Sequence, residues 1–170
     1  MPYDDHVNES ARHIQAVGCA VITVSDSRTE QTDESGTLIR QLLAGAGHHI
    51  VRYAIVRDEP EQVRKLLREL GDDDACRVVL LNGGTGIAAR DRTYEAVVAL
   101  LEKRLDGFGE LFRYLSYAEI GSGAIASRAV GGVYRGKLIF SMPGSADAVG
   151  LAMNKLIIPE LAHLVWELQK

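Results

Sequence analysis

Short runs of consecutive apolar residues, separated by stretches with helical spacing, constrain the fold of this chain more than any other feature. The first three runs lie at 17–24, 50–56 and 77–81, and helical patterns lie between them at 35–46 and 58–70. Because the runs are continuous rather than alternating, we expect both faces of the resulting sheet to be covered. Strands and helices that alternate at this spacing are typical of βαβ units, which predicts a parallel sheet.

The second half of the chain extends this pattern and adds a hairpin. Two short apolar runs at 130–134 and 137–140 flank Arg135-Gly136, which is a signal for a tight hairpin. At least one strand is therefore expected to run antiparallel to the others. Three further stretches have helical spacing: 93–104, 107–120 and 146–168, the last interrupted by Pro159.

Size and composition are those of one globular domain. The chain has 170 residues, of which 46% are hydrophobic and 25% are charged. We predict a single domain at 17–170, preceded by a polar N-terminal arm at 1–16 in which helical spacing is weak. We find no internal repeat that would suggest a second domain.

Charge and cysteine content exclude several classes of protein. The formal net charge of −4 provides no basic field to attract nucleic acid. No apolar run approaches the roughly 18 residues of a membrane span, and the acidic N-terminus does not resemble a signal peptide. Cys19 and Cys76 each begin an apolar run, which favours buried thiols of a cytoplasmic protein, with a disulfide between them as the less favoured alternative.

Two glycine-containing segments match nucleotide-binding patterns in spacing but lack the structural context. Residues 131–137 match a P-loop, but Leu138 stands where a Ser or Thr would hold magnesium, and a strand follows where a helix is required. Residues 84–89 match the loose dinucleotide pattern and follow a strand, but the next helix begins only near Thr93. We interpret the first segment as a hairpin and disfavour a nicotinamide or flavin site at the second.

Polar residues follow several strands of the predicted sheet. Because parallel strands end at the same edge, the loops after them are expected to lie close together. The last strand contributes to this edge only if it returns parallel to the others. The edge would then collect three carboxylates and two glycine turns, in the segments Ser25-Asp26, Asp58, Asn82–Asp91 and Pro143-Gly144-Ser145.

These residue types together indicate a site for phosphate. Gly83, Gly84 and Gly86 allow positive φ angles and close approach of a ligand, and their N–H groups can hold an anion together with the Thr85 hydroxyl. The helix that follows Gly144-Ser145 presents its positive end to the same edge. Carboxylates repel phosphate unless Mg²⁺ lies between them, so the combination predicts a phosphate or nucleotide site with Mg²⁺.

Each carboxylate also has a simpler interpretation. Asp58 precedes Glu59 and Pro60 at the start of a helix, where an aspartate commonly caps the helix. Asp91 can equally cap a loop, and Asp26 can stabilise a turn. The residues alone leave these alternatives open.

Seven segments, in this order along the chain, resemble the MoaB/MogA family of molybdopterin-binding proteins of molybdenum cofactor biosynthesis, which is similar to the G domain of gephyrin. The resemblance covers about residues 17–168, and the length of the chain favours the MoaB branch. The segments are Thr23-Val24-Ser25-Asp26, Asp33-Glu34-Ser35-Gly36, Asn82-Gly83-Gly84-Thr85-Gly86, Arg90-Asp91, Gly107-Phe108-Gly109-Glu110, Ser127-Arg128-Ala129 and Met142-Pro143-Gly144-Ser145.

The resemblance implies a fold, an assembly and an activity. It implies a three-layer α/β/α sandwich with a mostly parallel, mixed central sheet, and a homotrimer or homohexamer in the cytoplasm. It implies binding of molybdopterin and, in active members, its adenylylation with Mg-ATP and release of pyrophosphate. The alternative is a non-catalytic molybdopterin-binding protein of the same pathway, and other enzymes of that pathway are possible partners.

The resemblance also assigns residues. Asp58 and Asp91 correspond to the two functional aspartates of the family, and we expect both to be catalytic and to bind Mg²⁺. Arg92 and Tyr94 depart from the family pattern, which usually has a small apolar residue and a proline at these positions. The residues expected to contact substrate and phosphate are Ser25, Asp26, Gly83, Gly84, Thr85, Gly86, Pro143, Gly144 and Ser145.

Overall fold

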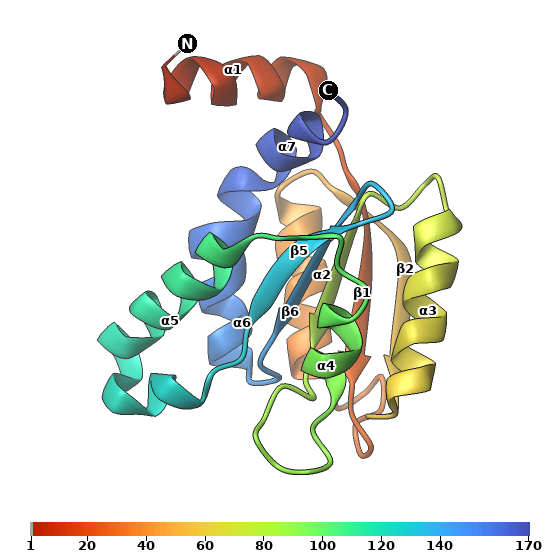
Figure 1. The fold of residues 1–170 in the computed structure, drawn as a ribbon. Helices are drawn as coiled ribbons and strands as arrows, with labels where there is room; N and C mark the ends of the chain where they lie inside the picture. Colours follow the sequence, from red (N-terminus) through yellow and green to blue (C-terminus); the bar gives the residue numbers. More distant parts are fainter. Residues whose placement is uncertain (1) are drawn as a thin grey trace.

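The computed structural model describes residues 2–170 and contains a six-stranded sheet in the order β2-β1-β3-β6-β5-β4 (Figure 1). Neighbouring strands among β2, β1, β3 and β6 are parallel, whereas β5 is antiparallel to both β6 and β4. The predicted mixed, mostly parallel sheet is therefore confirmed. The strands are β1 (Gly18–Val24), β2 (His49–Val56), β3 (Val78–Asn82), β4 (Lys103–Arg104), β5 (Val130–Tyr134) and β6 (Lys137–Met142).

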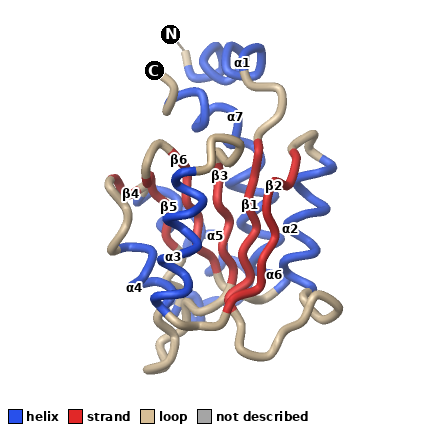
Figure 2. Tube along the Cα trace, turned by 90° about the vertical axis from the view of Figure 1, so that its right-hand side faces the viewer, coloured by secondary structure: helices blue, strands red, loops and turns tan. Residues whose placement is uncertain are grey.

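Helices cover both faces of the sheet, so the predicted α/β/α sandwich is also confirmed (Figure 2). One face packs against α2, α5, α6 and α7, and the other against α3 and α4. The helices are α1 (Tyr3–His13), α2 (Glu34–Gly45), α3 (Pro60–Asp72), α4 (Thr93–Val98), α5 (Asp106–Ile120), α6 (Ala146–Ala152) and α7 (Ile158–Glu167), with a 3₁₀ segment at Gly121–Ala126 and a π-helical turn at Met153–Ile157.

Strand β1 shows why the continuous apolar runs predicted covered faces. Every residue of β1 is buried. Cys19 and Val21 contribute to the core beneath α2 and α7, whereas Ala20 and Ile22 contribute to the core beneath α3. Successive side chains of a strand point to opposite faces, so a run that is apolar at every position serves two cores at once.

Residues 131–137 form the β5–β6 hairpin, as predicted, and not a phosphate-binding loop. Arg135 has φ 48° and Gly136 has φ 70°, the paired positive angles of a two-residue hairpin turn. The pairing of Tyr134 with Lys137 closes this turn. Strand β6 then runs parallel to β3, which brings its carboxyl end to the same edge as those of β1 and β3.

The prediction of one helix at 93–104 is wrong, because only Thr93–Val98 is helical. Lys103 and Arg104 instead form the short edge strand β4, which pairs with β5. Backbone hydrogen bonds from Glu102 N to Val133 O (2.8 Å) and from Leu105 N to Gly131 O (2.8 Å) hold this segment to the sheet. Pairing with a strand distant in sequence thus overrides the local helical spacing.

The N-terminal arm is more regular than its sequence suggested. Residues Tyr3–His13 form α1, which packs against α7 at the end of the molecule opposite the glycine turns (Figure 1). Acidic residues in its first turn and Arg12 and His13 in its last turn complement the helix dipole. The division into an arm at 1–16 and a domain at 17–170 stays a prediction.

The C-terminal helical stretch is continuous from Ala146 to Glu167 and is long and apolar enough, by length and composition alone, to cross a membrane. Its inner face is buried in the core through Val149, Met153, Leu161 and Val165. This packing is that of a core helix of a globular domain. Pro159 lies in the first turn of α7, directly after the π-helical turn, where its missing N–H is accommodated.

Candidate functional site

The candidate site lies where four parallel strands end. In the sheet, β2 lies on one side of the central pair β1 and β3, and β6 lies on the other. The chain therefore continues in opposite directions from β1 and from β3, and the strand order reverses between them. In open α/β sheets, ligands bind beyond the carboxyl ends of the strands at such a reversal. The predicted loops after these strands all gather at this edge, at the bottom of Figure 1.

The two glycine turns contact each other. Gly83 N donates a hydrogen bond to Met142 O (3.1 Å), and a Cβ atom on Gly144 would lie 3.2 Å from the Cα of Gly83. Gly83 has φ 97° and Gly84 has φ 67°, so both have the positive angles expected from the sequence. A Cβ on Gly83 would lie 2.2 Å from Val24 O, and one on Gly84 would lie 2.0 Å from Thr93 Oγ1.

Gly86 has a different reason to be glycine. It is not among the residues with positive φ, contrary to the expectation for all three glycines of this loop. A Cβ atom on Gly86 would instead lie 2.6 Å from Asp91 Oδ2. The absence of a side chain at Gly86 therefore makes room for the Asp91 carboxylate, which folds back over the start of its own loop.

Asp58 faces the same loop, and the interpretation of Asp58 as the cap of α3 is wrong. The residue before α3 is Glu59, and α3 receives no side-chain cap. Asp58 Oδ1 instead accepts hydrogen bonds from the Thr93 hydroxyl (3.2 Å) and from Arg92 N (3.4 Å), at the start of α4. Burial raises the pKa of the Asp58 carboxyl; these hydrogen bonds lower it, and the nearby Asp91 carboxylate raises it further.

Asp26 and Ser25 hold the loop after β1. Asp26 Oδ1 accepts a hydrogen bond from Asp58 N (3.1 Å), and its other oxygen forms an ion pair with Arg90. Ser25 Oγ accepts hydrogen bonds from Ser27 N (3.2 Å) and Arg28 N (3.1 Å) within its own loop. Asp26 thus stabilises its loop and also links it to the segment that carries Asp91.

Two cavities flank the glycine turns. One has a volume of about 260 Å³ and charged walls, lined by Asp26, Asp58, Glu59, Pro60, Ala89, Arg90 and Arg92. The other has a volume of about 240 Å³ and mainly apolar or small side chains, lined by Thr85, Phe112, Ser116, Ile120, Gly123, Ala124, Ala126, Ser127, Pro143, Ser145 and Ala148. Ser145 caps α6, because its Oγ accepts a hydrogen bond from Ala148 N (3.3 Å).

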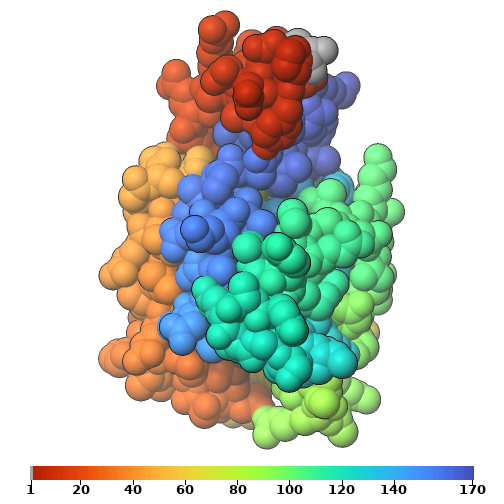
Figure 3. Space-filling view, turned by 90° about the vertical axis from the view of Figure 1, so that its left-hand side faces the viewer, coloured from red at the N-terminus to blue at the C-terminus, as the bar shows by residue number. Residues whose placement is uncertain are grey.

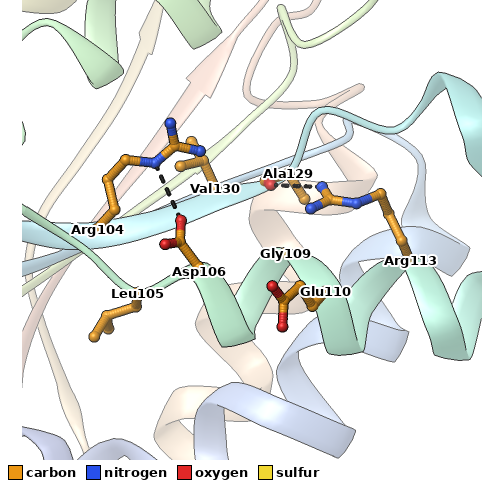
Figure 4. A pocket seen from close by; sticks show the side chains of 8 residues that line it. All are labelled: Arg104, Leu105, Asp106, Gly109, Glu110, Arg113, Ala129 and Val130. Atoms are coloured by element: carbon orange, nitrogen blue, oxygen red, sulfur yellow. Dashed lines mark hydrogen bonds and ion pairs between the residues drawn. The ribbon is translucent and has the colours of Figure 1, made fainter.

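A further polar pocket lies between α5 and β5, and none of its lining residues belongs to the glycine turns (Figure 4). Its volume is only about 90 Å³. Arg104 pairs with Asp106 (3.4 Å), and Arg113 donates to Ala129 O (3.1 Å), so the cationic groups that border it are already engaged. The glycine-turn edge is the better candidate for a ligand site.

Arg128 organises the site, although the sequence indicated no role for it. Its guanidinium donates hydrogen bonds to Thr85 O (3.1 Å), Gly86 O (2.6 Å) and Asp91 O (3.1 Å), and it forms an ion pair with Glu95. One cation thereby fastens both ends of the loop that carries Asp91. The Arg128 guanidinium also lies 4.9 Å from the centre of the Tyr94 ring, which gives this unusual tyrosine a structural role.

The donor set fits Mg²⁺ better than a metal held by protein alone. Among residues 2–170, no group of three or more His, Cys, Asp or Glu side chains could hold a metal ion. Mg²⁺ commonly binds one or two carboxylates and takes its other ligands from water and substrate phosphates. Asp58 and Asp91 supply such a pair of carboxylates beside the glycine turns.

Known proteins resemble this chain over nearly its whole length. Residues 20–163 match a family model described as a probable molybdopterin binding domain. The chain is 53% identical over 171 residues to molybdenum cofactor biosynthesis protein B of Bacillus subtilis, covering 100% of this chain and 99% of the relative. It is 52% identical over 174 residues to the protein of the same name from Staphylococcus carnosus, with complete coverage of both chains.

Solved structures agree with these relatives. A crystal structure of a molybdenum cofactor biosynthesis protein B has a TM-score of 0.89 and 54% identity, covering 91% of this chain and 96% of that one. The tungsten cofactor synthesizing protein MoaB from Pyrococcus furiosus has a TM-score of 0.83 and 36% identity, covering 92% and 99%. The chain therefore belongs to the MoaB/MogA family of molybdenum cofactor biosynthesis proteins.

Proposed function

We propose that this protein binds molybdopterin at the glycine-turn edge and adenylylates it with Mg-ATP. The observation that carries the proposal is the convergence of two glycine turns, which touch at Gly83 and Gly144, with the carboxylates of Asp58 and Asp91. Backbone N–H groups at such turns suit phosphate. Two carboxylates at a phosphate site suit Mg²⁺.

The proposed chemistry needs no nucleophile from the protein. An oxygen of the terminal phosphate of molybdopterin attacks the α-phosphorus of ATP, the bond between this phosphorus and the bridging oxygen to the β-phosphate breaks, and pyrophosphate leaves. The glycine turns would hold the phosphates in line for this transfer. Asp58 and Asp91 would hold Mg²⁺, which supplies positive charge to offset the negative charge that develops.

The properties of the two cavities support binding of a different substrate in each. The cavity lined by Thr85, Phe112 and Ile120 has the apolar walls that suit a flat pterin ring. The cavity lined by Asp58, Arg90 and Arg92 carries charges of both signs, which suits nucleotide phosphates with Mg²⁺. The glycine turn between them would hold the phosphate groups at which the two substrates meet.

The alternative is a protein of the same pathway that binds molybdopterin without chemistry. The Arg90–Asp26 ion pair favours it, because this pair lines the charged cavity and already neutralises a cation that could otherwise bind nucleotide phosphate. The presence of both Asp58 and Asp91 favours the enzyme.

Mixing the purified protein with molybdopterin and Mg-ATP and measuring pyrophosphate release separates the two functions. Release that requires all three components supports the enzyme. Molybdopterin binding without release selects the binding protein.

We further propose that the protein is a homotrimer or homohexamer in the cytoplasm. Helix α5 buries Phe108 and Phe112 against the sheet but exposes Leu111, Tyr114 and Tyr117 to solvent. Beside it, α5 and the α6–α7 stretch enclose an apolar cavity of about 560 Å³, on the face shown in Figure 3. Exposed apolar surface of this kind is typical of an interface between subunits.

Light scattering tests the assembly. A mass of three or six times 18.5 kDa supports the proposal, and a mass near 18.5 kDa at micromolar concentration contradicts it. Replacing Leu111 and Tyr114 together by Ser should lower the mass if α5 forms the interface. Cys19 and Cys76 are both buried and unpaired, as expected for a protein of a reducing compartment such as the cytoplasm.

A further inference from the structure

Asp33 lies outside the residues assigned to the site, yet its carboxylate is the centre of a buried hydrogen-bond network. It is 1% exposed and caps α2, with Oδ1 accepting a hydrogen bond from Gly36 N (2.9 Å). Its Oδ2 accepts hydrogen bonds from the hydroxyls of Thr23 (2.6 Å) and Tyr53 (2.5 Å). The carboxylate therefore joins β1, β2 and the start of α2 at one point.

The network leaves no room for a side chain at Gly36. A Cβ atom on Gly36 would lie 2.1 Å from Asp33 Oδ2 and 2.7 Å from Thr23 Oγ1, so a side chain there would displace the carboxylate. Among residues 2–170, no ion pair to Asp33 is found, and three hydrogen bonds satisfy its oxygens instead. A buried carboxylate held by hydrogen bonds alone fixes the positions of its donors.

Each glycine turn is connected to this network. Asn82 donates from Nδ2 to Thr23 Oγ1 (3.0 Å), and Asn82 directly precedes Gly83. Ser35, in the first turn of α2, donates from Oγ to Gly144 O (2.6 Å). Helix α2, which Asp33 caps, therefore holds the turn at Gly144 through Ser35. The Thr23 hydroxyl, which donates to Asp33, holds Asn82, the residue before Gly83.

We propose that Asp33 is a positioning residue that sets the spacing between the two glycine turns. It does not touch the ligand; it acts through Thr23–Asn82 on one turn and through Ser35 on the other. The proposal rests on the proposed function, because the phosphate of molybdopterin is taken to bind between these turns. A misplacement of about 1 Å at such a site can cost roughly a hundredfold, which makes the spacing measurable.

Thr23→Val and Tyr53→Phe form a matched pair for the test. Each removes one hydroxyl from the same Asp33 oxygen, but only Thr23 connects onward to a glycine turn. We expect Thr23→Val to raise the Kd for molybdopterin about tenfold and Tyr53→Phe to change it less than about twofold, at similar loss of thermal stability. Ser35→Ala, which breaks the second connection, should also raise the Kd and provides an independent variant if Thr23→Val folds poorly.

A readout without ligand separates this proposal from the proposed function. In the protein without ligand, hydrogen exchange measured by mass spectrometry should be faster at the amides of 82–86 in Thr23→Val and at those of 144–146 in Ser35→Ala. Tyr53→Phe should exchange like the unmodified protein.

Asp33→Asn, which leaves Thr23, Asn82 and Ser35 in place, should raise the Kd and speed exchange at both turns. An unchanged Kd and unchanged exchange in Asp33→Asn would overturn the positioning role. If the unmodified protein binds no molybdopterin, the proposed function fails, and the exchange rates alone decide the role of Asp33.

Discussion

The loop at Gly83–Gly86 and the β5–β6 hairpin match nucleotide-binding patterns about equally well in sequence, yet they have different surroundings. Both contain two successive residues with positive φ, Gly83 and Gly84 in the loop and Arg135 and Gly136 in the hairpin. A Cβ atom on Gly136 would meet nothing within 4 Å, whereas one on Gly84 would lie 2.0 Å from a hydroxyl oxygen. Positive φ alone therefore does not distinguish the turn that we propose to bind a ligand from a simple reversal of the chain.

What distinguishes the loop is polar side chains at close range. Gly83 faces the Val24 carbonyl, but Gly84 faces the Thr93 hydroxyl and Gly86 the Asp91 carboxylate. In the hairpin, Gly131 approaches the ring of Phe140, and Gly132 approaches the Leu101 side chain and the Lys103 carbonyl. The glycines of the hairpin serve packing and chain reversal, and those of the loop keep backbone and carboxylate groups together without intervening side chains.

Substitution of valine at one positive-φ glycine of each turn, Gly84 in the loop and Gly136 in the hairpin, should give the largest difference between the two turns. Gly84→Val should raise the Kd for molybdopterin at least ~100-fold, because the new side chain is strained at this positive φ and would clash with Thr93 and crowd the Asp58 carboxylate. Gly136→Val should leave the Kd within about twofold and cost only backbone strain of ~2 kcal/mol. Calorimetric titration of both variants, with thermal unfolding as a check on folding, measures the difference. Unchanged affinity in Gly84→Val would remove this loop from the site.

The second largest effect is expected at the carboxylates of the loop, because the carboxylates beside the hairpin turn, Glu102 and Asp72, are both engaged by Arg135. Asp91→Asn should keep the fold and molybdopterin binding but lower turnover with Mg-ATP by roughly 10²–10³-fold, because a neutral amide is a poor Mg²⁺ ligand. Asp58→Asn should behave in the same way. Asp72→Asn is the control, since Asp72 pairs with Arg135 at the hairpin and should not affect turnover. Pyrophosphate release measures all three, and near-normal rates in Asp91→Asn would refute the assigned role.

The sequence predicted the elements whose signals are local. The buried run at 17–24 and the hairpin at Arg135-Gly136 could be identified because apolar continuity and turn residues are properties of short segments. The common edge follows from the geometry of parallel strands, so the sequence alone predicts that Asp58 and Gly83 lie near each other. The end of α4 at Val98 could not be predicted, because it depends on pairing between Glu102 and Val133.

The parts of the site that the sequence did not indicate depend on contacts between distant residues. Arg128 lies in a segment that resembles the family, but nothing in that segment says that it reaches carbonyl groups about 40 residues earlier. Asp33 likewise gave no sign that it accepts a hydrogen bond from Tyr53. Sequence patterns locate loops; which side chains hold a loop in shape is decided by packing across the domain.

Arginine variants sharpen the comparison between the two turns at a smaller scale. Arg128→Gln removes the cation that fastens the loop from Thr85 to Asp91, and we expect a loss of about 2 kcal/mol in unfolding free energy and a roughly tenfold higher Kd for molybdopterin. Arg135→Gln removes the exposed hairpin pair with Asp72 and should cost under about 1 kcal/mol without changing the Kd. Urea unfolding and titration measure both quantities. Equal effects of the two variants on affinity would mean that Arg128 has no special role in shaping the loop.

The smallest expected effect concerns the pH dependence of stability at Asp58. Because burial raises the pKa of Asp58 above its ordinary value of 3.8, the folded state binds this proton more tightly than the unfolded state does. Below pH 3.8, Asp58 is protonated in both states, and its contribution to stability is fully present. This contribution is lost as the pH rises through the raised folded pKa, and above that pH the partly buried charge destabilises the folded state. Asn cannot ionise, and its side-chain oxygen can still accept the hydrogen bonds from Thr93 and Arg92.

Asp58→Asn should consequently be slightly more stable than the unmodified protein at pH 7, and this gain should shrink as the pH is lowered toward 4. Urea unfolding of both proteins at several pH values measures the difference, in which the titration of all other groups largely cancels. Glu69→Gln, at an exposed position of α3 that does not affect the pKa of Asp58, is the control and should give no gain. A variant that is less stable by the same amount at every pH would mean that the charge of Asp58 does not affect stability and that the amide fits this site less well than the carboxyl group. If Asp58→Asn is more stable only near neutral pH, the fold tolerates a destabilising charge beside the glycine turns. The hairpin carries no such charge.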